Sequence, residues 1–392
     1  MTQKLFDENA YQAEFEATVV SQTQTELGWE VVLDKTCFFP EGGGQDSDAG
    51  TLNGQKVKKL VKTDDGDIIH VMQEKIEQST IIGQIDWKKR FRNMQQHSGQ
   101  HILSGVLLNT YKLQTESASF TEKEGHITLE WSIPDNDLEK ALIAANEIIF
   151  ANKPIITKFI SLDEIEKYNL AKLPKDKFTK TGKIRIWQIE GFYTIPCGGT
   201  HCKSTGEIGN IFVKSNKIHG NRTDLNFTTG FVTLDYLTAT KKITSELAKM
   251  LEVGTDGLVD ATKKVMDDRH ALNLALRENQ EQVAAQKAVQ ILQTATKGKV
   301  TFTAFVYSEA DKGTVKTTLY QLAETPNSVH IAHGANVPLT VVSSKDVSLD
   351  TLSILTELKT KFNGKGGGSK TYWQAMITDH EQFVKELMEK LS

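Results

Sequence analysis

The chain has 392 residues, and its content of 39% hydrophobic and 24% charged residues is ordinary for globular proteins with a core of their own. The formal net charge of −4 argues against a nonspecific DNA binder, which would be basic, and no apolar run reaches the ~18 residues of a membrane span. Only three cysteines occur, at positions 37, 197 and 202, which disfavours a disulfide framework and predicts a reducing compartment, the cytoplasm.

Residues 1–88 are predicted to form a small β-barrel or a curled sheet, because short strand-like runs follow one another between Gly, Asp and Asn residues. Between two of these runs lies the segment FFPEGGGQD, residues 38–46. Gly42, Gly43 and Gly44 carry no side chains, so their backbone N–H groups can approach a ligand closely. A tight turn between strands is the alternative interpretation.

Residues 89–238 are predicted to form an α/β domain of two layers, in which helices cover an antiparallel sheet. A helix is expected at about 90–111, with further helices at 137–153 and 162–170. A basic run stands at the start of the first helix and contains Lys88, Lys89, Arg90 and Arg92. Strand-like runs occupy 126–133, 154–162, 184–195, 206–219 and 225–237.

Residues 239–298 have a helical composition and are predicted to form an arm with a bend at Gly254 and Gly257. Residues 299–392 alternate between strand-like and helical runs, which predicts a separate C-terminal α/β domain. A glycine-rich motif in that domain predicts either an anion-binding nest or a helix-capping turn, at Gly366, Gly367 and Gly368. The whole chain is therefore expected to be an α+β protein of several domains.

Two residue pairs with the same four-residue spacing carry the donor atoms of a zinc site. His97 and His101 lie about one turn apart on the predicted helix, so both imidazoles project from one face. Cys197 and His201 stand in the segment PCGGTH, where two glycines permit the backbone to bend. Each pair alone is a weak signal, but together they predict one Zn²⁺ site.

A closed structural zinc that only joins two elements is the alternative, because structural sites use four protein ligands. A catalytic zinc usually keeps one position open, or expands its coordination when substrate binds. The ligand count favours the structural alternative, and the sequence leaves both open.

The segments HSGQH (97–101) and IRIWQIEGFYTIPCGGTH (184–201) resemble the editing domain of alanyl-tRNA synthetases and of their freestanding relatives, the AlaX proteins. Residues 38–50 resemble the glycine-rich motif of the longer AlaX forms, and residues 364–376 resemble that of the C-terminal DHHA1 domain. The resemblance covers nearly the whole chain. Since the synthetase's charging module and the Asp-His-His phosphoesterase motif are missing, it implies a long-form AlaX-type editing factor that acts in trans.

The resemblance implies a zinc-dependent aminoacyl-tRNA deacylase whose substrate is tRNA(Ala) misacylated with serine, or also with glycine. A zinc-stabilised tRNA-binding adaptor without catalysis is the alternative, and a metallohydrolase acting on another ester or amide is a third hypothesis. No DNA or membrane partner is expected, and a homodimer through the C-terminal region is consistent with the family.

Roles for individual residues follow from these motifs. His97, His101, Cys197 and His201 are the expected metal ligands. Ser98 and Thr200 stand beside ligands and are expected to orient a water or the seryl side chain, with local hydrogen bonding as the alternative. The expected substrate-binding loop consists of Gly42, Gly43, Gly44 and Gln45. Phosphates of the tRNA are expected on Lys88, Lys89, Arg90 and Arg92, and on a second basic run of Lys172, Lys175, Lys177, Lys180, Lys183 and Arg185.

Overall fold

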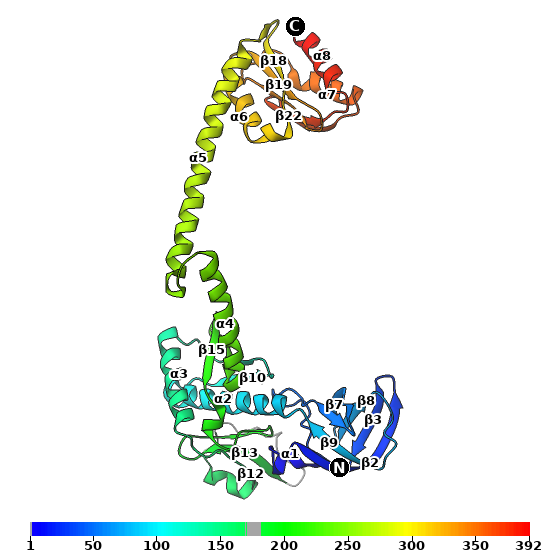
Figure 1. Cartoon of the computed structure of the whole chain (residues 1–392), viewed down its shortest axis with the longest axis vertical. Coiled ribbons are helices and arrows are strands. Elements are labelled where there is room, and N and C mark those ends of the chain that lie inside the picture. The colour runs from blue at the N-terminus through cyan, green and yellow to red at the C-terminus, as the bar shows by residue number, and fades with distance from the viewer. Residues whose placement is uncertain (1, 169, 171–181) are drawn as a thin grey trace. The chain divides into compact units, whose positions relative to one another are not determined.

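The computed structural model describes residues 2–168, 170 and 182–392. The chain forms two compact units, Met1–Ser245 and Glu246–Ser392, and both combine helices with sheets, so the α+β class is confirmed (Figure 1). The division into four domains stays a prediction, and its boundary at 238/239 falls inside helix α4 (Gly230–Met250). Among the described residues, no helix is both long and apolar enough to cross a membrane.

The N-terminal part of the first unit is a seven-stranded sheet in the order β6-β5-β9-β2-β3-β8-β7. Its two ends, β6 and β7, do not pair with each other in the described residues, so the sheet is open, which corrects the predicted barrel and agrees with the alternative of a curled sheet. The first half of strand β2 pairs with β9 and its second half pairs with β3. The register of the β2–β3 pair shifts between Val19 and Ser21, and such an irregularity bends a strand. The strands are β2 (Glu14–Thr25), β3 (Gly28–Leu33), β5 (Gly50–Leu52), β6 (Gln55–Lys56), β7 (Lys59–Lys62), β8 (Ile68–Met72) and β9 (Thr80–Ile85).

Helix α2 (Trp87–Tyr111) runs from this sheet into the central part of the first unit (Figure 1). Asp86 caps its N-terminus, because the Asp86 side chain accepts a hydrogen bond from the Lys89 N–H at 3.1 Å. The helix is buried continuously from Asn93 to Leu107 and packs on helix α3 and on a four-stranded sheet, which confirms the helix predicted at about 90–111. These elements are α3 (Asp135–Phe150), β10 (Thr115–Phe120), β11 (Gly125–Leu129), β15 (Ile211–His219) and β16 (Arg222–Thr229), with the sheet order β10-β11-β16-β15.

A three-stranded antiparallel sheet positions the segment that contains Cys197. The single strand predicted at 184–195 is wrong, because the chain reverses at Gly191, whose φ of +71° suits glycine. The result is a hairpin that ends one residue before Cys197. The strands are β12 (Ile156–Ser161), β13 (Lys183–Ile189) and β14 (Tyr193–Pro196), and the two 3-10 helices nearby are η1 (Leu162–Lys167) and η2 (Thr205–Ile208).

The strand-like run predicted at 225–237 is also partly wrong, because strand β16 ends at Thr229 and helix α4 begins at Gly230. Gly230 has a φ of +50°, and a Cβ atom there would lie 2.4 Å from the Gln95 side chain. Glycine at this position therefore lets the chain leave the strand while passing close to α2.

The second unit begins within α4 and continues with α5 (Leu258–Leu292), after the short 3-10 helix η3 (Thr255–Gly257). This break confirms the predicted bend at Gly254 and Gly257. With 35 residues, α5 has a length of about 52 Å at 1.5 Å per residue. Its only fully buried residues are Ala284 and Ala288, four apart on one face, near the end that packs on α6 (Lys312–Leu322).

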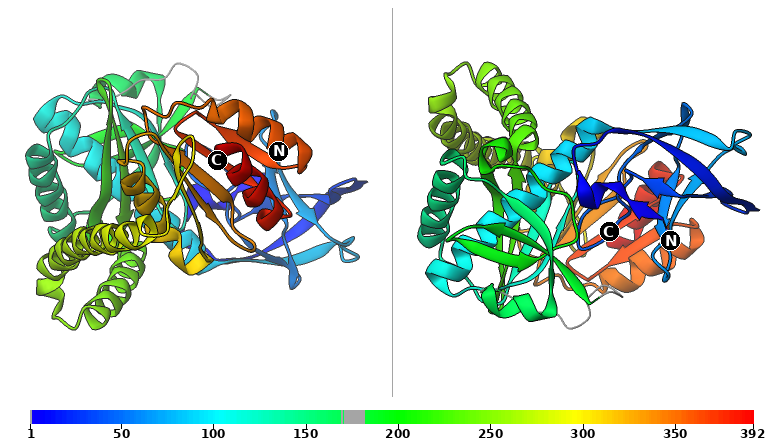
Figure 2. Two further views of the ribbon diagram at one scale, coloured as in Figure 1. Left: turned by 90° about the horizontal axis from the view of Figure 1, so that it is seen from above. Right: turned by 90° about the horizontal axis from the view of Figure 1, so that it is seen from below.

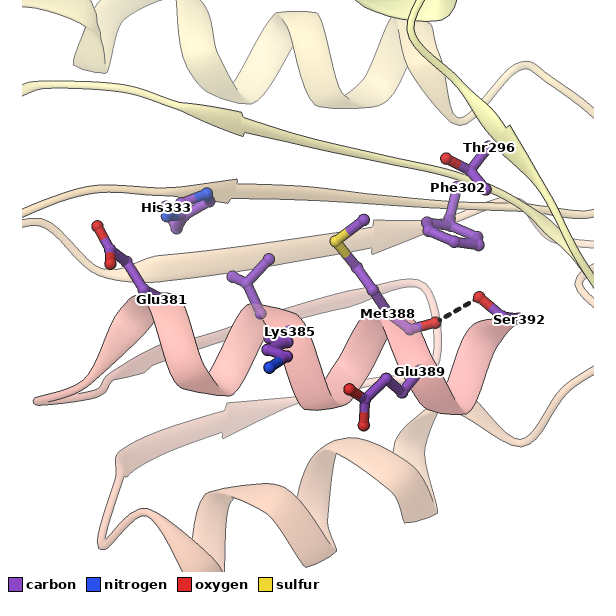
Figure 3. Close-up of a pocket in the computed structure, with 9 residues that line it drawn as sticks. Thr296, Phe302, His333, Glu381, Lys385, Met388, Glu389 and Ser392 are labelled. Carbon is purple, nitrogen blue, oxygen red and sulfur yellow. Dashed lines mark hydrogen bonds between the residues drawn. The ribbon is translucent and has the colours of Figure 1, made fainter.

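The C-terminal sheet has six strands in the order β17-β18-β19-β20-β22-β21. The one parallel pair, β18 with β19, is connected through α6, as a parallel crossover requires. Helix α8 lies along the strands, and the side chains of Met388 and Phe302 lie between them beside a shallow groove (Figure 3). The elements are β17 (Thr296–Lys297), β18 (Thr301–Val306), β19 (Ser328–His333), β20 (Leu339–Ser343), β21 (Lys365–Gly368), β22 (Tyr372–Met376), α7 (Thr351–Lys361) and α8 (His380–Leu391).

The C-terminal glycine motif forms the edge strand β21, so both the nest and the capping turn predicted there are wrong. Cβ atoms at Gly366 and Gly368 would lie only 2.3 and 2.2 Å from backbone oxygens of β22. The glycines therefore permit close pairing of two strands. Figure 2 shows the elements of the whole chain in two further views, from above and from below.

Candidate metal centre

The four predicted zinc ligands converge in the first unit. The donor atoms of His97, His101, Cys197 and His201 all lie within 4.8 Å of one another, and all four residues are buried. Cys197 Sγ lies 3.2 Å from Nε2 of both His97 and His201. A tetrahedral zinc, with bonds of ~2.3 Å to sulfur and ~2.0–2.1 Å to nitrogen, separates its ligand atoms by about 3.3–3.6 Å. The two sulfur–nitrogen distances are close to these values, and the donor set of one thiolate and three imidazoles is compatible with a Zn²⁺ ion.

Gln45 orients the first of these imidazoles. Its Oε1 atom accepts the backbone N–H of Thr200 at 3.0 Å, and its Nε2 atom donates to Thr200 Oγ1 at 2.8 Å. Because the backbone N–H is an unambiguous donor, this oxygen is the acceptor that also faces His97 Nδ1 at 3.0 Å. The proton of His97 therefore resides on Nδ1, and the lone pair of Nε2 faces Cys197.

Ser98 lies behind a second ligand. Its hydroxyl accepts the Cys202 N–H at 3.1 Å and lies 3.4 Å from His201 Nδ1, which leaves Nε2 of His201 toward the cluster. Burial holds the pKa of His201 well below its usual range, and the neighbouring His97, His101 and Arg185 lower it further. His201 is therefore neutral, as a metal ligand must be.

Cys202 stands directly after His201 but is not part of the cluster. It is 2% exposed, and burial, with the nearby Glu207 carboxylate, raises the pKa of its thiol. Cys202 therefore stays protonated, whereas a zinc ligand has to be a thiolate.

The loop that carries Cys197 is fixed from two sides. The Arg185 guanidinium donates to the backbone oxygens of Cys197 at 3.1 Å and Gly199 at 2.6 Å. On the other side, a Cβ atom at Gly199 would lie 2.2 Å from Cε1 of His97, so only glycine lets the loop approach the helix this closely. Arg185, predicted to bind phosphate, is only 7% exposed and holds the loop instead.

The glycine-rich segment delivers Gln45 to this site as a tight hairpin turn. Gly42 and Gln45 exchange both backbone hydrogen bonds, at 3.0 and 3.1 Å, across Gly43 and Gly44. The φ angles of Gly43 and Gly44 are +61° and +85°, which is the geometry of a type I′ turn. The Phe120 N–H donates to Gly44 O at 2.8 Å and fixes the hairpin to β10. The tight turn given as the alternative is therefore confirmed, and substrate binding by Gly42, Gly43, Gly44 and Gln45 stays a prediction.

Aromatic rings enclose the cluster. The Phe120 ring centroid lies 4.3 Å from that of His97, and the Trp187 centroid lies 4.9 Å from that of His101. Both aromatic residues are at most 2% exposed. They restrict the access of water to the ligands, which strengthens electrostatic interactions inside the site.

The basic run at the start of α2 is mostly not available for phosphate. Arg90 is 0% exposed, and its guanidinium binds the Asp48 carboxylate and donates to the backbone oxygens of Ala10 and Cys37. The prediction that Arg90 contacts tRNA is therefore wrong. This buried ion pair, Arg90 with Asp48, joins α2 to the N-terminal sheet and the segment after the glycine hairpin.

The other members of the run differ in exposure. Lys89 pairs with Asp46 at 2.8 Å, and Arg92 pairs with Asp235 at 2.6 Å, with side chains 16% and 14% exposed. Lys88 is exposed. In the second predicted run, Lys172, Lys175, Lys177 and Lys180 lie outside the described residues.

Sequence reasoning missed the roles of Arg185, Phe120 and Trp187 and placed Gln45 in a substrate-binding loop. Gln45, Ser98 and Thr200 are all 0% exposed. The Gln45 amide contacts His97, the Ser98 hydroxyl accepts the Cys202 N–H, and the Thr200 hydroxyl accepts from Gln45. One signal was present for Arg185: a charged residue between Ile184 and Ile186 in an otherwise apolar strand indicates a buried, paired charge.

Two family profiles match this chain. The profile "tRNA synthetases class II (A)" matches residues 3–89, and "Threonyl and Alanyl tRNA synthetase second additional domain" matches residues 184–225. The second range contains Cys197 and His201, together with the strand of Arg185.

Three relatives show how far the similarity extends. Alanyl-tRNA editing protein AlaX-L of Pyrococcus horikoshii is 26% identical over 404 residues, which covers 100% of this chain and 98% of that protein. Alanyl-tRNA editing protein Aarsd1 of Danio rerio is 31% identical over 274 residues, 66% of each chain. An alanine–tRNA ligase of Methanococcus maripaludis is 26% identical over 411 residues, covering all of this chain but 43% of the ligase. With an editing protein matched from end to end, this chain belongs to the AlaX-type family of alanyl-tRNA editing proteins.

Proposed function

We propose that this protein is a hydrolase that acts in trans and removes a wrongly attached amino acid from tRNA(Ala). The names of the two editing proteins support the tRNA substrate and the editing reaction. The observation that carries the proposal is the buried convergence of His97, His101, Cys197 and His201, in a chain that matches an editing protein over its full length.

The donor set supports Zn²⁺ as the bound metal, because one thiolate with three imidazoles is a combination that zinc prefers. When bound, zinc can polarise an ester carbonyl or lower the pKa of a water molecule. The chain's own residues prepare the site: Gln45 and Ser98 orient two imidazoles, and Phe120 and Trp187 exclude solvent.

We propose that substrate approaches from the side of Cys197 and Gly198. Cys197 is 8% exposed, more than the 2–5% of the three histidine ligands, and Gly198 beside it is exposed. The hydroxyls of Ser98 and Thr200 are buried behind the ligands. Their contacts support a role in positioning His201 and Gln45 rather than in direct catalysis.

Serine is the proposed main amino acid, and glycine a second one. A polar site that hydrogen-bonds a hydroxyl rejects an analogue without it far better than an apolar pocket rejects an added methylene. Such a site would therefore hydrolyse seryl-tRNA(Ala) and spare the correct alanyl ester.

The test is a deacylation assay with purified full-length protein and tRNA(Ala) charged with serine, glycine or alanine. We expect serine to be released fastest and alanine to stay attached, and we expect a zinc chelator to stop the release. Equal release of alanine, or no release from any of the three by zinc-loaded protein, would contradict the proposal.

The second candidate is a zinc-stabilised tRNA-binding adaptor, favoured by the four protein ligands, which is the number of a structural site. The same assay separates the two, because an adaptor binds tRNA(Ala) without releasing an amino acid. Dimerisation through the C-terminal region stays a prediction that light scattering can check. The cytoplasm is the proposed compartment, supported by three free cysteine thiols.

A further inference from the structure

A cleft lies beside the glycine hairpin, on the N-terminal sheet. It has a volume of about 400 Å³ and lies between hairpin residues 41–44 and the edge strand β7 (Lys59–Lys62). Residues 41–44 are all exposed, as are Lys59 and Lys62 at the two ends of β7. The cleft is therefore open to solvent along both walls.

The hairpin presents two backbone donors. Within the described residues, the N–H groups of Gly43 and Gly44 have no hydrogen-bond acceptor, although their neighbours Gly42 and Gln45 bond to each other. Consecutive N–H groups in a turn with positive φ angles form a concavity that binds anions. A side chain is not needed for this contact. The glycines themselves are required by the positive φ angles and, at Gly44, by the Ala118 oxygen, which would lie 2.1 Å from a Cβ atom.

The opposite wall supplies positive charge. Neither Lys59 nor Lys62 forms a salt bridge with a carboxylate in the described part of the chain, in contrast to Lys89 and Arg92. Glu41 is the one acidic residue that lines the cleft, so the lining has a net charge of +1. Lys59 and Lys62 are three residues apart on the edge strand β7, roughly 10 Å along it, so their side chains leave the strand on opposite faces and flank the edge that lines the cleft. Two separate cations along this edge suit a ligand with several phosphates better than a single free anion.

We propose that this cleft binds the phosphodiester backbone of the single-stranded 3′ end of the tRNA, through Lys59, Lys62 and the N–H groups of Gly43 and Gly44. The proposal rests on the proposed function. The residue that follows Gly44 is Gln45, whose amide contacts the ligand His97. An RNA strand in the cleft therefore passes directly beside the hairpin that reaches the metal centre.

The test compares Lys59→Ala/Lys62→Ala with Lys56→Ala/Lys58→Ala in the full-length protein. The control removes the same charge from two exposed lysines, one on β6 and one between β6 and β7, that do not line the cleft. The probe is tRNA(Ala) without an amino acid, and its affinity is measured at several salt concentrations. We expect the cleft variant to bind the tRNA about 5- to 20-fold more weakly than the wild-type protein. The slope of log K against log[salt] should decrease in magnitude by about 1.4 in this variant. The control variant should keep the wild-type affinity and slope.

An additional variant, Glu41→Gln, removes the opposing charge and should tighten binding. If the cleft variant and the control bind tRNA with the same slope, the cleft proposal is overturned, whatever the deacylation assay shows. If only the cleft variant has a reduced salt dependence of tRNA binding, but the wild-type protein releases no amino acid, the binding site is supported and the proposed hydrolase activity is contradicted. The two claims are thus tested by separate measurements.

Discussion

The two halves of the metal centre are built in different ways. His97 and His101 are placed by a regular helix, α2, in which a four-residue step returns a side chain to the same face. Cys197 and His201 lie in an irregular loop after β14, whose shape depends on Arg185 from β13 and on Gln45 from the hairpin of the N-terminal sheet. One pair is thus positioned by local structure, and the other by contacts between residues far apart in sequence.

This difference predicts where the centre is vulnerable. The helical pair tolerates changes around it as long as the helix stays folded, whereas the loop pair depends on a few hydrogen bonds and on the absence of side chains at one position. Gln45 links the two, because its amide contacts both His97 and the backbone of Thr200. Variants on the loop side should therefore have effects nearly as large as the loss of a ligand.

The largest effect is expected for Cys197→Ala, which removes the only thiolate of the cluster. Zinc bound in four-ligand sites contributes about 10–16 kcal/mol, so the loss of one ligand should weaken zinc binding by roughly 10²- to 10³-fold. Competition with a chelator of known affinity measures this change. Cys202→Ala is the control, because Cys202 is also buried and lies outside the cluster. Equal losses in both variants would show that loss of a buried side chain, not of coordination, is responsible.

Gly199→Ala should come next. Its added Cβ atom would lie 2.2 Å from His97 Cε1, so either the loop or the imidazole has to move, at a cost of about 1–3 kcal/mol. We expect lower zinc content and a lower melting temperature. Gly198→Ala is the matched control, since nothing lies within 4 Å of a Cβ atom there. A Gly199→Ala protein with normal zinc content would mean that the loop does not need this close approach.

Gln45→Ala should weaken zinc binding by about 10- to 100-fold, the range for residues that orient metal ligands. Gln45→Glu keeps an acceptor oxygen for His97 Nδ1 and for the Thr200 N–H, so it should retain most of the affinity. Titration of apo protein with zinc distinguishes the two variants. If Gln45 only contacts substrate, both variants will bind zinc normally and differ from wild type in KM alone.

The smallest effect is expected for Ser98→Ala. Its hydroxyl accepts one neutral backbone hydrogen bond and lies 3.4 Å from His201, and a neutral hydrogen bond of about 0.5–1.5 kcal/mol corresponds to a change of roughly 2- to 10-fold. Single-turnover deacylation should decrease by no more than this. A loss of several hundredfold with zinc still bound would instead make Ser98 a catalytic residue.

The sequence was sufficient for features that depend on local spacing. It predicted helix α2 from its apolar spacing, the bend at Gly254 and Gly257, and the convergence of two four-residue pairs that occur in a cysteine-poor chain. It failed where a distant partner decides the outcome. Arg90 looks like part of a basic surface until Asp48, 42 residues away, is placed beside it. Gln45 looks like a loop residue until the fold brings it to His97 and Thr200.

The most direct test of the account is zinc K-edge X-ray absorption of the purified, zinc-loaded full-length protein. The account predicts one zinc per chain with a single sulfur neighbour at ~2.3 Å and imidazole nitrogens at ~2.0–2.1 Å. A zinc shell without sulfur, or with two sulfur atoms, would contradict a centre built from His97, His101, Cys197 and His201.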